Sequence, residues 1–464
     1  MATELCGSKL ISPYFGSSLY VWASVIAVTL GSLAAGYFYG GRLSLKEDRK
    51  SKLAGILLLA AIYMGFMPLL TFALPSLAIG MSLKPAVLLT SLLLLAVPMF
   101  LMGAASPLII SIQTNEKENA GKISGTVYSV STLGGIISTF LCGFWLIPTI
   151  GLNPTLIVFA VILAASLFLL LQKKNNSVIF LSLILLVVFG FTSKVPKKNC
   201  IWEKDGILGK INVIDDTLEE SVVRKLLVNN IVQTEIRIKE SESNYISDYI
   251  QILDSNIREG NTAKALVLGL GGGATSNLLV KKNYVVRGVE FDQNIIDAAK
   301  EYFFLDKKVS TVCDDARHFI NACYERYGVI LVDLFKAEEQ PAHVITHESL
   351  TKIVELIDPK NGQLIINWHG YSKGDRGLGT AILLNTLKLS GFKYELTALN
   401  EDEDHRNIVI FATLTDLSAK KYRIKDNTNT TTLVNKDGQP VLEKYNALAN
   451  QCWRENYIKY YYSN

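Results

Sequence analysis

Long apolar runs are confined to the first 193 residues of this chain of 464, and no other feature of the sequence constrains the fold as strongly. A helix that crosses the hydrocarbon core of a bilayer needs about 20 mostly apolar residues, because its backbone amides find no water there. Six segments meet this requirement: residues 18–41, 53–74, 86–112, 123–147, 153–171 and 177–193. We therefore predict an N-terminal polytopic α-helical membrane bundle over residues 1–195, in contact with the lipid bilayer of the cell (inner) membrane.

The first and fourth of these segments are rich in Gly, Ala, Ser and Thr. Small side chains let neighbouring membrane helices approach closely, so we expect both segments to form packing faces inside the bundle. No charged residue interrupts the interior of any segment, which disfavours an ion or proton path built from intramembrane carboxylates. A transporter with a purely polar pathway is the alternative for this half of the chain.

The polar stretches around these segments indicate an orientation. The first 18 residues lack the basic start and cleavable apolar run of a signal peptide, and are expected to be the end of a helix whose upstream part is missing. Residues 42–52 carry five basic side chains, which favours a cytoplasmic loop. Counting spans then places residues 172–176 on the same side. If residues 177–193 also cross, everything after them lies outside.

Residues 199–464 have the charge content of a globular region. Apolar and polar residues alternate over 199–244, with a turn at the two asparagines 229–230, which predicts a small antiparallel β subdomain. Strand and helix patterns alternate over 245–415, which is typical of an α/β Rossmann-like domain with a parallel sheet and crossover helices. Residues 416–464 form a polar connector and an aromatic C-terminal tail, to which we assign no function.

The first strand of the predicted parallel sheet ends in a glycine cluster. Without side chains, these residues let the backbone approach a ligand at the carboxyl edge of the sheet: Gly269, Gly271, Gly272 and Gly273. The next strand ends at Glu290, about 20 residues on, where a carboxylate can accept hydrogen bonds from both ribose hydroxyls. The structural alternative is a tight turn that serves packing alone.

Acidic residues also end the next two strands. Asp314 and Asp315 follow the third strand and can accept the exocyclic amine of an adenine. Asp333 ends the fourth strand and faces the open pocket, although a helix cap is the alternative role for it. This series of carboxylates suits a cationic adenosyl sulfonium better than a pyrophosphate.

Taken together, the motifs of both halves resemble the spermidine synthase (polyamine aminopropyltransferase) family, specifically its membrane-fused bacterial type, the fused major-facilitator and spermidine synthase-like proteins. The resemblance rests on "LISPYFGSSLYVW", "GYFYGGRL", "GTVYSVSTLGGIISTFLCGFWLIPTIG", "GKINVID", "LLVNNIVQTEI", "VLGLGGG", "GVEFDQNIIDAAKEYF", "DDARHFI" and "DLFKAEEQPAHVITHESL". It implies an S-adenosylmethionine-dependent-transferase fold for the C-terminal region and aminopropyl transfer from decarboxylated S-adenosylmethionine to an amine.

The resemblance also implies roles for individual residues. Asp333 matches the catalytic aspartate, which orients the acceptor amine and takes its proton. Glu290 matches the acid that binds ribose, and Asp314 and Asp315 fall at the adenine-side motif. Gln233 matches a glutamine of the N-terminal strands that faces the donor.

Three departures from the family pattern concern the acceptor. Ala274 and Lys336 stand where the family has aspartates, and only Tyr245 remains of a tyrosine-histidine-glutamate run. Each charge-assisted contact to an ammonium contributes on the order of 1.5 to 3 kcal/mol. We therefore expect an acceptor other than plain putrescine, with Tyr245 and Lys336 as candidate substrate-binding residues.

Other classes of function receive little support. The formal net charge of +4 is too small for this length to indicate nucleic acid binding. The six cysteines contain no CxxC pair, so neither a zinc site nor a disulfide framework is indicated. His343, His347 and Glu348 have a spacing that could bind metal on a helix, but they match an ordinary loop of the family, and we predict no metal.

The leading hypothesis is a membrane-bound transferase for a small-molecule amine or a membrane-associated acceptor, with decarboxylated or ordinary S-adenosylmethionine as donor. The alternatives are an S-adenosylmethionine-dependent methyltransferase and a non-catalytic sensor or assembly module attached to a transport or scaffold bundle. A homo-oligomer is compatible with each. Because the donor is a cytosolic metabolite, it argues for a cytoplasmic C-terminal domain, whereas the count of spans argues for an outside one.

Overall fold

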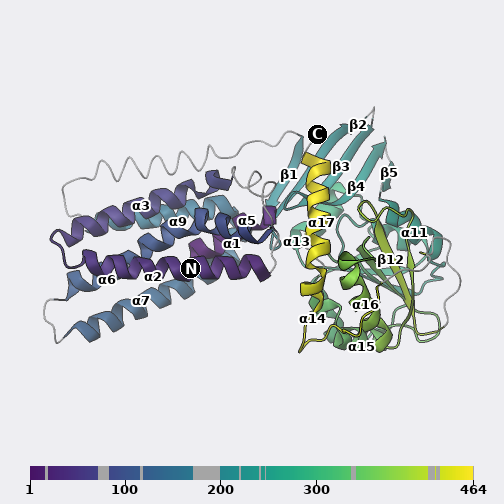
Figure 1. The fold of residues 1–464 in the computed structure, drawn as a ribbon. Coiled ribbons are helices and arrows are strands. Elements are labelled where there is room, and N and C mark those ends of the chain that lie inside the picture. The colour runs from purple at the N-terminus through teal and green to yellow at the C-terminus, as the bar shows by residue number, and fades with distance from the viewer. Residues whose placement is uncertain are drawn as a thin grey trace. The chain divides into compact units, whose positions relative to one another are not determined.

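The computed structural model describes residues 1–15, 19–71, 83–114, 119–170, 199–218, 221–239, 242–245, 247–335, 341–415, 424 and 429–462. The chain divides into two compact units, Met1–Lys198 and Asn199–Asn464. Each unit has its own hydrophobic core, and each is described by itself (Figure 1).

The described part of the first unit is helical (Figure 1). Its elements are α1 (Ala2–Phe15), α2 (Leu19–Leu43), α3 (Arg49–Leu70), α5 (Leu83–Ser91), η2 (Leu92–Ala96), α6 (Val97–Gln113), α7 (Ala120–Phe140), η4 (Leu141–Leu146), α8 (Ile147–Ile150) and α9 (Leu152–Leu170). The π-helical turns η2 and η4 join their neighbours into continuous helices, and each lies just before a proline, Pro98 or Pro148. A proline removes one helical hydrogen bond and crowds the carbonyl four residues earlier, which a wider turn relieves.

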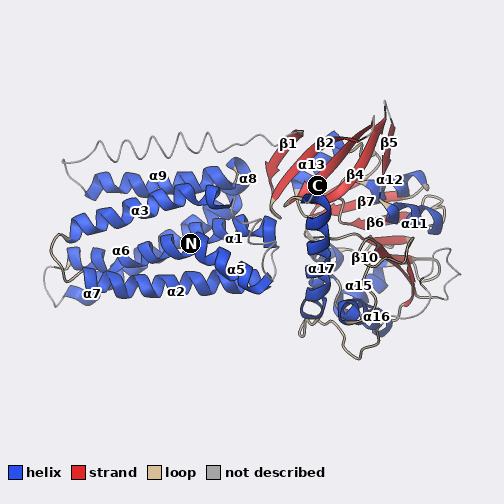
Figure 2. Ribbon diagram, turned by 45° about the horizontal axis from the view of Figure 1, so that its top comes forward, coloured by secondary structure: helices blue, strands red, loops and turns tan. Residues whose placement is uncertain are grey.

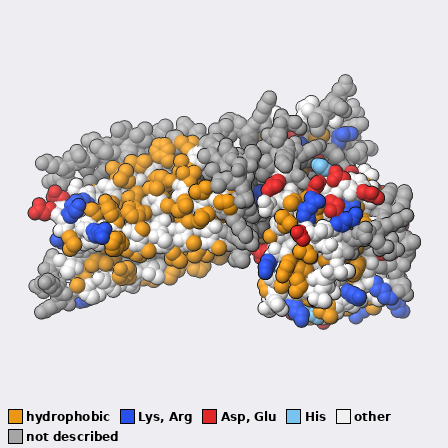
Figure 3. Space-filling view, in the orientation of Figure 1, with side chains coloured by type: hydrophobic (Ala, Val, Ile, Leu, Met, Phe, Trp, Pro, Cys, Tyr) orange, Lys and Arg blue, Asp and Glu red, His pale blue; other side chains and the backbone are white. Residues whose placement is uncertain are grey.

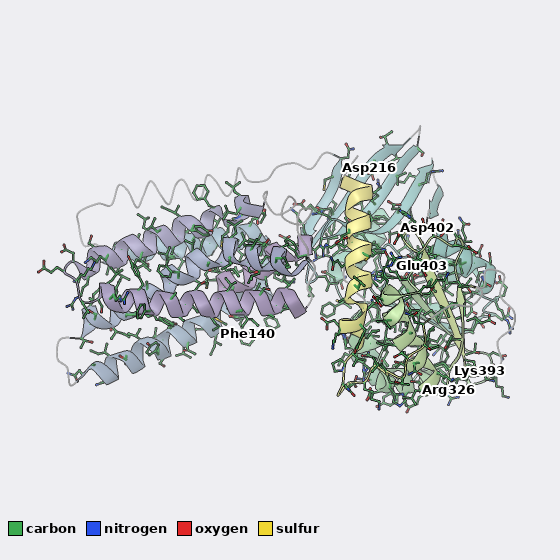
Figure 4. All side chains as sticks on the ribbon, viewed as in Figure 1. Phe140, Asp216, Arg326, Lys393, Asp402 and Glu403 are labelled. Atoms are coloured by element: carbon green, nitrogen blue, oxygen red, sulfur yellow. The ribbon has the colours of Figure 1, made fainter. Side chains whose placement is uncertain are left out.

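Four helices are long and apolar enough to cross a membrane: Val21–Leu43, Arg49–Leu70, Pro85–Gln113 and Ala120–Ile150. They correspond to the first four predicted spans. The fifth falls on α9, whose apolar part, Leu152–Leu167, is shorter. The sixth, at 177–193, lies outside the described residues. Apolar side chains cover much of the visible face of this unit (Figure 3). Figure 4 labels one apolar residue of α7, Phe140.

Small residues bring α2 and α6 into backbone contact. A Cβ atom on Gly36 would overlap the Phe100 carbonyl oxygen, and one on Gly40 would overlap the backbone of Ala104. In the other direction, a Cβ on Gly103 would lie 2.6 Å from the Leu33 carbonyl oxygen. The packing face predicted for the first segment is therefore present.

The fourth segment packs closely at fewer positions within the described residues: a Cβ on Gly135 would lie 3.0 Å from Met1 Cγ, and Cys142 is fully buried. Helix α7 has no buried residue, and a Cβ on Gly125 or Gly134 would have no atom within 4 Å. Large apolar side chains of the same continuous helix stand exposed, with Phe144 at 79% and Trp145 at 64%. Composition indicates that a helix can pack closely, but only the fold supplies the partner.

The second unit contains two sheets (Figure 2). The first is antiparallel in the order β1-β2-β3-β4-β5, formed by β1 (Cys200–Asp205), β2 (Lys210–Leu218), β3 (Ser221–Val228), β4 (Ile231–Lys239) and β5 (Glu242–Tyr245). The predicted turn lies between β3 and β4, where Asn229 and Asn230 take positive φ values of 52° and 63°. One face of this sheet packs against Phe303 and the preceding helix α13 (Gln293–Tyr302).

The second sheet has the order β11-β12-β10-β9-β6-β7-β8. Its strands are β6 (Lys264–Leu268), β7 (Val285–Glu290), β8 (Ser310–Cys313), β9 (Val329–Val332), β10 (Gln363–His369), β11 (Lys393–Thr397) and β12 (Asn407–Thr413). The five strands from β10 to β8 are parallel, as predicted, and β12 and β11 add an antiparallel edge. The Rossmann-like fold preceded by an antiparallel subdomain is confirmed.

Helices cover both faces of this sheet. One face packs against α14 (Ala316–Ala322), α15 (His347–Leu356) and α16 (Leu378–Leu389), and the other against α11 (Asp248–Asn256), α12 (Ala274–Lys281) and α13. A further helix, α17 (Leu442–Tyr462), packs on α16. The strand order changes direction between β6 and β9, and ligands of such sheets bind at the carboxyl ends beside this point.

The contact between α2 and α6 gives a test with adjacent residues. Gly40→Ala should destabilise the helical unit by about 1 to 3 kcal/mol, because the new methyl group overlaps the Ala104 backbone. Gly41→Ala is the matched control, since no atom lies within 4 Å of its Cβ. We expect a lower melting temperature in detergent only for Gly40→Ala. Equal melting temperatures would contradict this account of the packing.

Candidate functional site

The glycine turn after β6 lies at the change of strand order. Gly269, Gly271 and Gly273 have φ values of 90°, 51° and 84°, which favour glycine. The Gly272 N–H donates a hydrogen bond of 2.8 Å to Thr234 Oγ1 of β4. A Cβ on Gly269 would overlap the carbonyl oxygen of Asp333. The turn therefore connects the ends of β6 and β9 with the antiparallel sheet.

Glu290 lies beneath this turn. Its carboxylate accepts hydrogen bonds from the backbone N–H groups of Leu270 (3.0 Å) and Asp292 (3.2 Å). Burial raises the pKa of Glu290, and backbone hydrogen bonds oppose that rise. The acid predicted for ribose thus also holds the glycine turn in place.

Asp314 and Asp315 have partners of their own. The Asp314 N–H bonds the Glu290 carbonyl oxygen at 3.0 Å, so both lie at one edge of the sheet. The Asp314 carboxylate pairs with His318 Nδ1 at 2.9 Å and raises the pKa of that imidazole. Asp315 caps α14, accepting hydrogen bonds from the N–H groups of Arg317 and His318. A helix cap is the alternative role named above for Asp333, but in the structure it is Asp315 that caps a helix.

Asp333 is held in one orientation at the end of β9. Asn367 Nδ2 donates to Asp333 Oδ1 at 2.9 Å, and the Tyr249 hydroxyl donates to Oδ2 at 3.1 Å. Asn367 in turn accepts a hydrogen bond from Asn407 Nδ2 at 2.9 Å. Burial raises the pKa of Asp333, although both hydrogen bonds favour its charged form. Such a carboxylate is suited to receive a proton.

Asp333 opens into a cavity of about 520 Å³. The lining residues come from β4, the start of α11, the ends of β9 and β10, the segment before β12, and α17: Val232, Gln233, Thr234, Glu235, Ser247, Asp248, Tyr249, Ile252, Asp333, Phe335, Asn367, His369, Leu399, Asn400, Asp404, His405, Arg406, Asn407 and Trp453. Gln233 and Asp333 are the predicted site residues in this wall. The glycine cluster, Glu290, Asp314 and Asp315 gather at the neighbouring strand ends.

The remaining sequence candidates fall elsewhere. Ala274 is buried at the first position of α12, and Lys336 lies outside the described residues. Tyr245 is the last residue of β5, where its backbone pairs with Ile236. His343 and His347 share no partner among the described contacts: His343 is 3.5 Å from Asp315, and His347 bonds Ser390 Oγ at 2.9 Å.

Sequence reasoning missed several residues around Asp333. Tyr249 lies four positions after Tyr245, within a helix pattern that gave no sign of a polar role. Asn367 and His369 are polar residues at the end of β10, next to β9, and their position at a strand end was a usable signal. Trp453 belongs to the tail that received no function.

Parts of the second unit are similar to known proteins. Residues 250–359 match the spermine/spermidine synthase domain. A probable polyamine aminopropyl transferase from Bifidobacterium longum is 30% identical over 141 residues, 30% of this chain and 31% of that protein. An N-terminal histidine N-methyltransferase from Emericella nidulans is 29% identical over 161 residues, 32% of this chain and 28% of that protein.

A crystal structure of a probable spermidine synthase from Corynebacterium glutamicum superposes with a TM-score of 0.40 and 15% identity, covering 48% of this chain and 83% of the other. The chain spans about three tenths of the length of these two curated relatives. The second unit thus contains a region similar to the spermidine synthase domain. That region includes the glycine turn, Glu290 and Asp333, whereas Gln233, Asn367 and Trp453 lie outside it.

The hydrogen bond between Thr234 and Gly272 can be tested by isosteric replacement. Thr234→Val leaves a buried N–H without its acceptor, which should destabilise the second unit by about 1 to 3 kcal/mol. Thr234→Ser keeps the hydroxyl and should cost less, about 0.8 kcal/mol for the lost methyl group. Denaturant unfolding of the full-length chain, followed by fluorescence, measures both. A serine variant less stable than the valine variant would refute the assignment.

The raised pKa of Asp333 predicts a pH-dependent stability difference. The unfolded chain ionises Asp333 at a lower pH than the folded chain, so the wild type loses stability as pH rises through the folded pKa. Asp333→Asn has no such group. The melting temperature of the variant minus that of the wild type should therefore increase from acid to neutral pH and then level off.

Asp254→Asn on α11 is the matched control for this measurement, since its carboxylate is 63% exposed and pairs with Lys282 at the surface. Its difference from the wild type should stay small at every pH. A difference for Asp333→Asn that is constant or falls with pH would contradict the assignment.

Proposed function

We propose that this chain is a membrane-bound transferase that uses decarboxylated S-adenosylmethionine as donor. It transfers the aminopropyl group to an amine other than plain putrescine. The observation that carries the proposal is Asp333, a carboxylate with a raised pKa that faces a cavity and is oriented by Tyr249 and Asn367. The similarity of residues 250–359 to the spermidine synthase domain supports the same chemistry.

The donor is proposed to bind at the strand ends beside Asp333. Glycines at the turn leave room for close backbone approach, and the change of strand order opens the sheet at this point. A carboxylate has about four acceptor sites, so Glu290 can hold the turn and also accept hydrogen bonds from ribose hydroxyls. Asp314 and Asp315 are proposed on the adenine side, and Gln233 faces the donor from β4.

The proposed reaction needs an unprotonated acceptor nitrogen. Its lone pair forms the new C–N bond while the C–S bond of the sulfonium breaks, and a neutral thioether leaves. Asp333 orients the nitrogen and takes up its proton, which explains why an aspartate with a raised pKa suits this position. Tyr249 and Asn367 act through Asp333 as positioning residues.

The similarity to an N-terminal histidine N-methyltransferase favours a second candidate, methyl transfer from ordinary S-adenosylmethionine. Asp333 could take up a proton in either reaction. The two candidates differ in whether the donor retains its carboxylate.

Calorimetric titration of the full-length chain in detergent separates these functions. Binding of decarboxylated S-adenosylmethionine supports aminopropyl transfer, whereas binding of the ordinary donor alone indicates a methyltransferase. Binding of neither at millimolar concentration would overturn the enzyme proposal and leave a sensor or assembly module.

Asp333→Asn should keep the donor dissociation constant but lower the transfer rate by about 10²- to 10⁴-fold, the usual contribution of a general base. Asp254→Asn should change neither quantity. Wild-type transfer rates in Asp333→Asn would refute the role of this carboxylate.

The proposed donor indicates on which side of the membrane the second unit lies. We propose that the second unit faces the cytoplasm, where S-adenosyl donors are made, and that a membrane-associated acceptor accounts for the attached helices. A topology reporter fused after Asn464 should then score as cytoplasmic, and an outside score would contradict catalysis with a cytosolic donor.

A further inference from the structure

The cavity at Asp333 has an aromatic wall on one side. The ring centroids of Phe335 and His369 lie 5.5 Å apart, and those of His369 and Trp453 lie 5.6 Å apart. All three residues line the same cavity as Asp333. His369 is only 2% exposed, so this row of rings has a buried centre.

Trp453 is held in this wall by helix α17. Leu442, Asn446 and Ala449 of that helix are each less than 5% exposed, and Gly379 of α16 has no room for a Cβ beside Asn446. Helix α17 therefore has a fixed position on α16, and this position also fixes the indole of Trp453 in the cavity wall. This helix lies outside the region similar to the synthase domain.

The carboxylates on the α17 side of the cavity already have cationic partners. Asp404, which lines the cavity, is 2.6 Å from Arg376, and Glu403 is 3.4 Å from the cavity residue Arg406. Cys452, the neighbour of Trp453, lies close enough to Arg376 and Asp404 for both charges to act on its thiol, and its pKa is raised chiefly by burial. Of the two carboxylates described on this side, neither is uncommitted and available for a second ammonium group.

Three acidic residues also line the cavity. Asp333, Glu235 and Asp248 line it from the end of β9, from β4 and from the start of α11. Glu235 follows Thr234, which bonds the glycine turn, and Asp248 precedes Tyr249, which bonds Asp333. Glu235 already lies 3.8 Å from Lys225, so the cavity combines Asp333, which is oriented for one cationic nitrogen, with an aromatic wall that suits an apolar group.

We propose that the acceptor is a monoamine with an apolar, ring-sized body. Its single nitrogen binds at Asp333, its body packs against Phe335, His369 and Trp453, and Trp453 determines the specificity. The reaction in this inference rests on the proposed function. The kind of acceptor is inferred separately, from the residues that line the cavity. An aromatic side chain contributes a large contact area in a fixed geometry, which favours a flat body over a flexible diamine.

The test uses the full-length chain in detergent with decarboxylated S-adenosylmethionine and measures release of the thioether product. Phenethylamine, hexylamine and putrescine serve as acceptors at equal concentration. We expect kcat/KM to fall in that order, with phenethylamine at least about 10-fold above putrescine, since one desolvated aromatic contact is worth about one factor of ten. A preference for hexylamine over phenethylamine would overturn the inference and leave the proposed function standing, whereas a preference for putrescine would contradict both.

Variants of α17 locate the specificity. Trp453→Ala should raise KM for phenethylamine by about 10- to 100-fold and leave kcat within about threefold, whereas Trp453→Phe should restore most of the affinity. Leu448→Ala is the matched control, because Leu448 is 42% exposed on the same helix. An equal loss with phenethylamine and putrescine in Trp453→Ala would show general damage rather than specificity, and would count against the proposal.

A binding measurement separates this inference from the reaction. Calorimetric titration of the wild type and Trp453→Phe with phenethylamine should show binding without any donor, and it should be at least about 10-fold weaker in Trp453→Ala. If no donor is bound or consumed, the proposed function fails, yet amine binding that depends on Trp453 would still support the pocket assignment. Absence of amine binding in the wild type would refute it.

Discussion

The close approach of Gly269 to the carbonyl oxygen of Asp333 is the constraint on which the candidate site depends. A Cβ at this position would overlap that oxygen and separate β6 from β9, which are joined by the hydrogen bond from the Asp333 N–H to the Leu268 carbonyl oxygen at 2.8 Å. The contact fixes the end of β9, and therefore Asp333, beside the glycine turn. The hydrogen bond from Gly272 to Thr234 then ties the antiparallel sheet to the same point.

The acidic residues at the strand ends have structural roles that accompany the chemical roles proposed for them. Glu290 holds the backbone of the glycine turn, and Asp315 caps α14. Both arrangements leave acceptor sites on the carboxylates, so a structural role and a ligand role are compatible. Asp333 differs because, among the described residues, side chains from Tyr249 and Asn367 satisfy its carboxylate, and it opens into the cavity.

The helical unit shows how much of the packing between helices can be predicted from composition. Segments 18–41 and 123–147 are both rich in small residues, and the same argument applied to both. Gly36 and Gly40 meet the backbone of α6, whereas Gly125 and Gly134 meet no described neighbour. A small residue permits close approach, but the approach itself depends on which helix lies opposite, and a local pattern holds no information about that.

Hydropathy period and turn residues are local properties, so the two-part organisation, the alternation of strands and helices, and the carboxylates at successive strand ends could be predicted without the structure. Long-range packing brings Tyr249, Asn367 and Trp453 into one cavity with Asp333, and it places Glu290 beneath the glycine turn. Trp453 lies 120 positions beyond Asp333 in the numbering (453 minus 333). Such contacts depend on how distant elements pack, which no local pattern specifies.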